Sequence, residues 1–408
     1  MKQQHLIRYF LCALVLILGS CKPQQILQSG ESTKKVQKGK QHREEQPFCT
    51  GAENTQAYLS LLQNKKVGLV TNATGQVGSQ HLVDFLVQKN IGINRIFAPE
   101  HGFRGTADAG EHLDDGTDAK TGLPIVSLYG SNKKPKPEQL EGLDILVFDI
   151  QDVGARFYTY ISTLHYVMDA CAEAKLPLLV LDRPNPNGGF IDGPVLDVAY
   201  TSFVGMHPIP VLHGLTIGEY ALMINGEGWL KDGVQCKLSV IPCLGYKKSM
   251  NYHVPVKPSP NLPNDQAIKL YASLCFFEGT PISVGRGTTT QFQVYGSPQL
   301  PETGFSFTPQ PNEGAKDPLY KGQICNGENL TLLPFEPQLD VQWLIKTYQL
   351  WADKKSFFTS FFTKLAGSPN LQQQIESGLD APAIKQSWQA ELKQFDQKRQ
   401  AYLRYSLK

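Results

Sequence analysis

The chain has 408 residues, of which 41% are hydrophobic and 19% are charged. This composition is that of an ordinary globular protein and excludes a disordered or fibrous chain. Lys2 and Arg8 lie in a segment expected to be cleaved, and without them 37 basic residues balance 37 acidic residues. A neutral chain lacks the basic footprint of a nucleic-acid-binding protein, so we expect no nucleic-acid partner.

Residues 1–20 have the pattern of an export signal. Lys2 and Arg8 precede an apolar run, YFLCALVLILG, which is too short to span a membrane as a mature helix. The run leads into Gly19-Ser20-Cys21, which resembles the lipobox of bacterial lipoproteins. That resemblance implies a lipoprotein signal peptide, acylation of Cys21, and an exported protein anchored to a membrane on the periplasmic or cell-surface side. An ordinary cleaved signal with an incidental cysteine is the alternative.

Residues 21–46 are polar and rich in lysine, so we interpret them as a flexible tether. In residues 47–249, apolar strand-like runs alternate with helix-length amphipathic segments, as is typical of a parallel sheet covered on both faces. We predict an α/β, Rossmann-like catalytic domain with a doubly wound, mainly parallel sheet. Its strands are expected at 66–72, 95–100, 124–130, 144–151, 177–184 and 237–242, with helices at 55–64, 80–90, 161–175 and 216–230.

The sequence pattern changes in residues 250–408. We predict that they form a smaller C-terminal α+β domain, which closes a cleft over the Rossmann-like domain. A proline-rich connector leads to a helix at 265–279, then to glycine-rich short strands and a helical end at 338–354 and 381–407. Ligand sites favour such domain interfaces. Six cysteines follow Cys21, none with CxxC spacing, so we expect no zinc site and assign no disulfide.

Reactive side chains follow four of the predicted strands, those at 66–72, 95–100, 144–151 and 177–184. In an open parallel sheet, ligands bind beyond the carboxyl ends of the strands. Polar residues at one strand end are commonly helix caps or loop solvation, but the same enrichment at four ends favours a functional site. The candidates at these ends are Asn72, Glu100, His101, Arg104, Asp149, Gln151, Asp152, Arg156, Tyr158, Arg183 and Asn185.

The motifs of several common enzyme classes are missing from the sequence. There is no GxGxxG or GxxxxGK[ST], which disfavours dinucleotides and nucleoside triphosphates, and no HExxH or GxSxG. Glu100 and His101 are adjacent and would point to opposite faces of a strand, which makes a shared metal awkward. We expect neither a metal nor a cofactor. Carboxylates, arginines, amides and aromatics together fit carbohydrate chemistry, in which a glycosidase protonates the leaving oxygen.

Glu100 is the favoured general acid. It follows a mostly apolar run and Pro99, where partial desolvation would raise the pKa of its carboxyl group. A helix cap or a salt bridge to Arg104 is the alternative. Asp149, Asp152 and Glu219 are candidates for a second catalytic group, although each also fits a structural role; Thr216 and Glu219 have the spacing of a capping box.

Further substrate contacts are expected from outside the four strand ends. His213 is a candidate, with a hydrogen-bonded core histidine as the alternative. In the C-terminal domain Asn261 and Arg286 are candidates, and the glycines beside Arg286 would let the main chain approach a ligand closely. Arginines such as Arg183 and Arg286 would suit an anionic group on the substrate.

Eight motifs in order resemble those of the exo-β-N-acetylmuramidase family, glycoside hydrolases formerly known as a bacterial domain of unknown function. They are VGLVTNATG, FAPEHGFRG, DILVFDIQDVGARFYTY, LDRPNPNGG, HGLTIGEYA, SPNLP, FFEGT and GRGT, and the resemblance runs from about residue 50 to the C-terminal tail. It implies release of terminal N-acetylmuramic acid from the non-reducing end of peptidoglycan fragments, as in cell wall recycling. It also implies that Glu100, in the PEHG motif, is catalytic. Thr289 departs from the family pattern, which has an acidic residue there.

Under this resemblance the substrates are muropeptides or peptidoglycan disaccharides, and the lactyl carboxylate of muramic acid would bind Arg156, Arg183 or Arg286. The substrate's own acetamido group or a second carboxylate would complete the mechanism, and both alternatives stay open. Two other functions stay open as well. One is a non-catalytic surface lipoprotein that captures muropeptides, and the other is a hydrolase of a different amino sugar. The oligomeric state is not predicted.

Overall fold

The computed structural model describes residues 47–408 except 101, 104–114 and 335–336. The predicted signal peptide and tether, Cys21, His101 and Arg104 therefore lie outside the described residues. Residues 45–408 form one compact unit. Within the described part of this unit, no helix has the length and apolar character needed to cross a membrane.

A seven-stranded sheet lies at the centre of the fold, in the order β11-β8-β7-β1-β4-β6-β5. Every neighbouring pair is parallel except β5 and β6. When the six strands other than β5 are numbered by their order along the chain, their order across the sheet is the 3-2-1-4-5-6 order of Rossmann folds. The strands are β1 (Val67–Thr71), β4 (Ile93–Ala98), β5 (Gly116–Thr117), β6 (Pro124–Ser127), β7 (Ile145–Asp149), β8 (Leu178–Leu181) and β11 (Leu238–Ile241). The predicted fold class is confirmed. Five of the six predicted strand segments contain one of these strands, and the segment at 95–100 overlaps β4, which begins two residues earlier.

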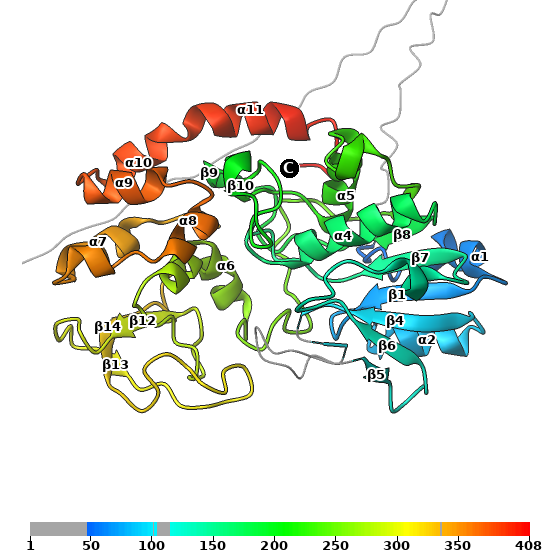
Figure 1. The fold of residues 1–408 in the computed structure, drawn as a ribbon, viewed down its shortest axis with the longest axis horizontal. Helices are drawn as coiled ribbons and strands as arrows, with labels where there is room; N and C mark the ends of the chain where they lie inside the picture. Colours follow the sequence, from blue (N-terminus) through cyan, green and yellow to red (C-terminus); the bar gives the residue numbers. More distant parts are fainter. Residues whose placement is uncertain (1–46, 101, 104–114, 335–336) are drawn as a thin grey trace, which may run out of the picture. The chain divides into compact units, whose positions relative to one another are not determined.

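Helices cover both faces of this sheet because successive side chains of each strand point to opposite sides. Leu69 of β1 packs in one hydrophobic cluster with α1 (Leu59–Leu62) and α2 (Leu82–Gln88). Its neighbour Val70 packs in another with α4 (Tyr160–Glu173) and α5 (Ile217–Gly226) (Figure 1). Burial on both faces explains why the strands are continuous apolar runs in the sequence.

Shorter elements complete the first part of the chain. They are the helix α3 (Pro137–Leu140), the antiparallel pairs β2 (Gln76–Val77) with β3 (Gln80–His81) and β9 (Asp192–Val195) with β10 (Pro210–Leu212), and the 3-10 turns η1 (Thr55–Ala57), η2 (Val198–Tyr200) and η3 (Lys231–Gly233).

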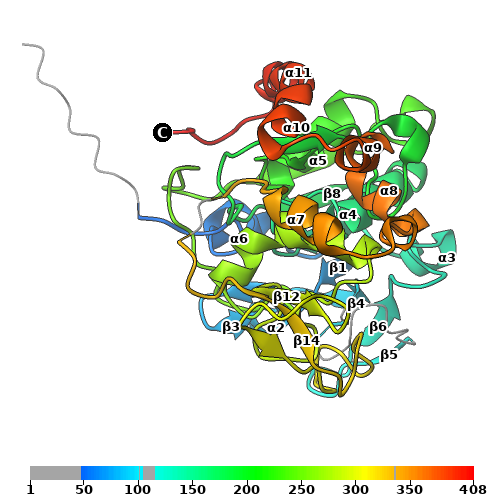
Figure 2. The same cartoon turned by 90° about the vertical axis from the view of Figure 1, so that its left-hand side faces the viewer.

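The C-terminal part combines helices with a three-stranded antiparallel sheet in the order β12-β14-β13. This confirms the predicted smaller α+β portion. Figures 1 and 2 show α6, β12 and β14 beside the central sheet, whereas α11 returns over α5. The elements are α6 (Asp265–Leu274), η4 (Cys275–Gly279), β12 (Val294–Ser297), β13 (Ser306–Phe307), β14 (Cys325–Asn329), α7 (Gln342–Leu350), η5 (Lys354–Ser356), α8 (Ser360–Ala366), α9 (Asn370–Glu376), α10 (Ala381–Ser387) and α11 (Gln389–Arg399).

Aromatic contacts join the C-terminal part to the carboxyl end of β7. Tyr271 of α6 packs edge-to-face on Phe157 and Tyr158, with ring centroids 5.3 and 5.8 Å apart. Tyr158 also donates a hydrogen bond to the main-chain oxygen of Pro258 at 2.6 Å. These contacts hold the connector and α6 over the segment between β7 and α4, where the polar strand ends lie.

Candidate active site

Glu100 lies two residues beyond the end of β4 and is half-buried. Its carboxylate accepts a hydrogen bond from the Thr159 hydroxyl at 2.8 Å. Its main-chain oxygen is 3.4 Å from the Tyr160 hydroxyl, which donates to it. Thr159 and Tyr160 form the start of α4, so the strand end and the helix start together orient the Glu100 side chain.

Glu100 lines a cavity of about 300 Å³, which we call the Glu100 cavity. Its volume is at the lower end of the range for small-molecule sites and suits a single sugar unit. Residues on both sides of the predicted boundary at 249/250 line it, so both parts of the chain build the site. Its lining residues include Tyr129, Tyr158, Thr159, Tyr160, Ser259, Asn261, Tyr271, Glu278, Arg286 and Phe292.

Tyr129, which follows β6, is a neighbour of Glu100 that the sequence reasoning did not select. Burial, together with the nearby Glu100 carboxylate to which its hydroxyl hydrogen-bonds, raises the pKa of Tyr129 to about 12. The phenol is therefore protonated at neutral pH and acts as a hydrogen-bond donor in the cavity. Its place directly after the apolar run at 124–128 was the signal that could have identified it.

Arg286 and Glu278 form an ion pair at the wall of the cavity. The Arg286 Nε donates to the Glu278 Oε1 at 2.7 Å, and the guanidinium lies 5.1 Å from the ring centroid of Phe292. Burial lowers the pKa of Arg286, but the Glu278 carboxylate outweighs that effect, so the net shift is upward and the arginine stays charged. About a quarter of each side chain is exposed, 26% and 25%. A ligand carboxylate can therefore reach Arg286.

Asn261 lines the same cavity and carries an unpaired acceptor. Its amide nitrogen donates to the main-chain oxygen of Gly314 at 2.5 Å. Its amide oxygen is buried and has no hydrogen-bond partner among the described residues. An unpaired buried acceptor costs about 1–3 kcal/mol, so a hydroxyl or amide N–H of a ligand would be favourable there.

A second cavity of about 250 Å³ adjoins the first, and we call it the Lys257 cavity. Tyr160 and Ser259 line both cavities, so the two meet at these side chains. Asn72 lines the Lys257 cavity, and its amide nitrogen donates to the Tyr160 hydroxyl at 2.8 Å. Lys257 and Glu313 supply charges of opposite sign. Of the predicted site residues, the structure thus brings together Asn72, Glu100, Tyr158, Asn261 and Arg286.

Asp149 and Arg183 line neither cavity and pair with each other. Arg183 donates to both carboxylate oxygens of Asp149, from Nε at 2.6 Å and from NH2 at 2.9 Å. At most 2% of either side chain is exposed. NH2 also donates to the main-chain oxygen of Gln76. Buried charges are costly unless they are paired, and this pair joins the ends of β7 and β8.

Arg156 is fully buried and lines neither cavity. Its guanidinium donates to four main-chain oxygens, those of Pro194, Ile209, Leu365 and Ala366. Burial lowers the pKa of Arg156 to about 9. Two of the four acceptors lie at the C-terminal end of α8, where a cation is favourable. Arg156 therefore ties β9 and β10 to α8.

Glu219 is also held by internal partners. The predicted capping box with Thr216 is present at the start of α5. The Glu219 Oε2 accepts from Lys248 Nζ at 2.5 Å in a pair that is fully buried, and Oε1 accepts from the main-chain nitrogen of Arg404 at 2.8 Å. Neither Glu219 nor Lys248 lines the Glu100 or Lys257 cavity.

The remaining candidates beyond β7 and β8 hold the neighbouring loops together. Asp152 accepts from the main-chain nitrogen of Gly154 at 2.6 Å and lies 3.7 Å from the His213 Nε2. The side chain of Gln151 donates to the main-chain oxygen of Pro184, and that of Asn185 to Leu215. None of these four candidates lines either cavity.

Thr289, the departure from the family pattern, is exposed and likewise lines neither cavity.

Family comparisons cover nearly all of the described chain. Residues 67–266 match the N-terminal domain family of exo-beta-N-acetylmuramidase NamZ, and residues 269–405 match its C-terminal domain family. The chain belongs to the NamZ family. The two NamZ matches meet between residues 266 and 269, and the boundary that we placed at 249/250 stays a prediction.

Similar proteins agree with the NamZ assignment. The chain is 40% identical over 377 residues to the peptidoglycan beta-N-acetylmuramidase NamZ of Bacillus subtilis, covering 85% of this chain and 89% of that protein. Two crystal structures of DUF1343 family proteins from Bacteroides fragilis resemble it with TM-scores of 0.83 and 0.77, at 45% and 30% identity. Each comparison covers 88% of this chain and 99% of the other.

The contacts of Arg156 predict a loss of stability when it is replaced. Arg156→Met leaves four buried main-chain oxygens without their donor, which should lower the free energy of unfolding by about 3 kcal/mol. Urea denaturation measures this, with Arg404→Met, at an exposed arginine, as the control. The folded fraction should keep its KM. Wild-type stability together with a raised KM would instead make Arg156 a substrate contact.

Proposed function

We propose that this chain is an exo-acting β-N-acetylmuramidase that releases terminal N-acetylmuramic acid from the non-reducing end of peptidoglycan fragments. The NamZ matches over both parts of the chain support a glycosidase that acts on peptidoglycan. The observation that carries the proposal at this site is the Glu100 carboxylate in a small aromatic cavity that also holds an accessible arginine.

The two adjoining cavities suit the two sugars on either side of a scissile bond. The muramic acid unit would occupy the Glu100 cavity, with its lactyl carboxylate on Arg286 in competition with Glu278. The unpaired amide oxygen of Asn261 would accept a hydroxyl or amide N–H of the sugar. The leaving sugar would extend past Tyr160 and Ser259 into the Lys257 cavity. The scissile oxygen would then lie close to Glu100.

In this arrangement Glu100 carries the proton transfer. Thr159 and Tyr129 both hydrogen-bond its side chain and hold it in one orientation toward the glycosidic oxygen. Protonation of that oxygen by a carboxyl group lowers the barrier to departure of the sugar.

Few of the described carboxylates are placed to act as a second catalytic group. Glu278 is the other carboxylate that lines the Glu100 cavity among the described residues. Asp149, Asp152 and Glu219 line neither cavity. Among the described residues, Glu278 is therefore the candidate nucleophile or base, and the 2-acetamido group of the substrate is the recognised alternative to a second carboxylate.

Replacing Glu100 tests the proposal directly. Glu100→Gln keeps the size of the side chain and removes its acid–base function, so turnover of a chromogenic N-acetylmuramide should fall by at least about a thousandfold. Glu138→Gln, at an exposed glutamate on α3, should leave turnover unchanged. Circular dichroism would verify that both variants fold. Wild-type turnover in Glu100→Gln would remove Glu100 from the catalytic role.

Calorimetric binding measurements and turnover assays together separate the proposal from its alternatives. Tight binding of muramides by the wild-type protein without release of any product would favour a protein that captures muropeptides. Turnover of glucosaminides in preference to muramides would favour a hydrolase of another amino sugar.

Arg286 should determine the preference for muramic acid. Arg286→Gln removes the cation that would bind the lactyl carboxylate, so KM for a muramide should rise about tenfold or more. KM for the matching glucosaminide, which lacks that carboxylate, should change little. Arg404→Gln serves as the control for loss of a positive charge elsewhere. Equal effects on both substrates would show that Arg286 does not contact the lactyl group.

We also propose that the protein is an exported lipoprotein attached to a membrane through Cys21, on the strength of the lipobox pattern. Cells grown with an alkyne-tagged fatty acid should incorporate the label into the wild-type protein but not into a Cys21→Ala variant. Label that persists in the variant would contradict attachment at Cys21.

A further inference from the structure

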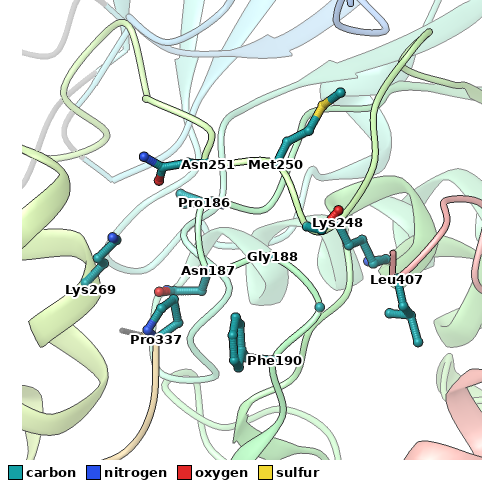
Figure 3. Close-up of a pocket in the computed structure, with 12 residues that line it drawn as sticks. Pro186, Asn187, Gly188, Phe190, Lys248, Met250, Asn251, Lys269, Pro337 and Leu407 are labelled. Atoms are coloured by element: carbon teal, nitrogen blue, oxygen red, sulfur yellow. The ribbon is translucent and has the colours of Figure 1, made fainter. Parts of the chain in front are cut away.

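A third cavity, of about 590 Å³, lies apart from the proposed active site. Figure 3 shows its lining residues, which come from the loop after β8, the segment at 248–251, α6 and the C-terminal tail. It shares no described lining residue with the Glu100 or Lys257 cavity. Lys269 lines this cavity and Tyr271 lines the Glu100 cavity. Two residues along a helix differ by about 200°, so the cavities lie on opposite sides of α6.

The walls of this cavity include apolar side chains that are unusually open to solvent. Phe190, Met250 and Leu407 are 50%, 40% and 42% exposed, and they come from three separate segments of the chain. Single exposed apolar residues need no explanation, but several that converge on one hollow mark a binding surface.

Two glycines let the loop after β8 pass close to Lys248 and Leu407, which line the same cavity. A Cβ atom at Gly188 would lie 2.5 Å from the main-chain oxygen of Lys248, and one at Gly189 would lie 2.7 Å from a methyl group of Leu407. The main chain can follow this path only without side chains at these positions.

Two of the polar side chains that line this cavity, those of Asn187 and Lys269, are suited to bind a ligand. Asn187 is 1% exposed, its amide nitrogen donates to Val153, and its amide oxygen has no partner among the described residues. Lys269 is half-buried, and none of the twelve described lining residues is acidic. Lys248, by contrast, is neutralised by Glu219. The cavity therefore offers a buried acceptor on Asn187, an available cation on Lys269 and an apolar wall, and the exposed Ser249 and Asn251 also line it.

We propose that this cavity is a second ligand site that binds a short apolar peptide with a free carboxylate. A peptide N–H would donate to the Asn187 amide oxygen, the carboxylate would pair with Lys269, and small apolar side chains would pack on Phe190, Met250 and Leu407. A neutral apolar ligand would leave Lys269 unused, and a sugar would leave the apolar wall uncovered. The peptide uses all three features. The site does not depend on Glu100 or on the reaction proposed for it.

The probe is N-acetyl-alanyl-alanine, in its L,L and D,D forms, titrated into the whole protein and followed by calorimetry and NMR. At least one form should bind with Kd of about 1 mM or tighter. Its methyl ester has the same shape but lacks the carboxylate, and it should bind about tenfold more weakly. The same titration on Glu100→Gln should give an unchanged Kd, so that a failure of the proposed reaction and a failure of this site remain distinguishable.

Two variants test the walls. Lys269→Gln should weaken binding of the acid about tenfold and leave binding of the ester unchanged, whereas Lys65→Gln, at an exposed lysine elsewhere, should have no effect. Phe190→Ala should weaken both probes, and because Phe190 is half exposed the variant should fold. Muramidase turnover should stay at the wild-type level in all three variants. Absence of binding by either form at about 10 mM, or equal affinity for acid and ester, would overturn the proposal.

Discussion

The buried ion pair between Asp149 and Arg183 is the interaction on which the carboxyl edge of the sheet depends. In a doubly wound sheet, ligands bind beyond the carboxyl ends of the strands at the point where the strand order reverses, which here lies between β1 and β7. Asp149 ends β7 at this point, and Arg183 reaches back to it from the loop after β8. Both charges are buried away from water, so removal of either residue would leave the other as an unpaired buried charge, which is strongly destabilising. The pair therefore fixes the relative positions of the two loops that leave this edge.

The predicted site residues fall into two groups with different tasks. One group stays inside the fold and joins segments, as Arg156 does with four main-chain oxygens and Glu219 does with Lys248. The other group faces the cavities, where Glu100 and Arg286 keep partial exposure. A rigid inner layer is what a glycosidase requires, because its acid must be held against the scissile oxygen without freedom to rotate.

The helix α6 separates the Glu100 cavity from the third cavity. Tyr271 of α6 packs on Phe157 and Tyr158 and so closes the Glu100 cavity. The opposite side of the same helix carries Lys269 and faces the third cavity. The helix α6 thus lines two cavities of different chemistry. The Glu100 cavity is aromatic and polar, whereas the third cavity has an apolar wall and a single available cation. The short spacing between Lys269 and Tyr271 makes this possible, because a helix turns by about 100° per residue.

The sequence by itself determined the fold class and the place of Glu100. Apolar runs separated by amphipathic helices require a parallel sheet covered on both faces, and strand ends must then meet at one edge. Only the tertiary structure decided which polar residues at that edge face a ligand. Arg156 and Arg286 are both arginines near glycines, but one is enclosed by main-chain oxygens and the other borders a cavity. Burial and pairing arise from contacts between residues distant in the chain, so the local pattern cannot distinguish them. The same reason kept Tyr129 out of the predicted site.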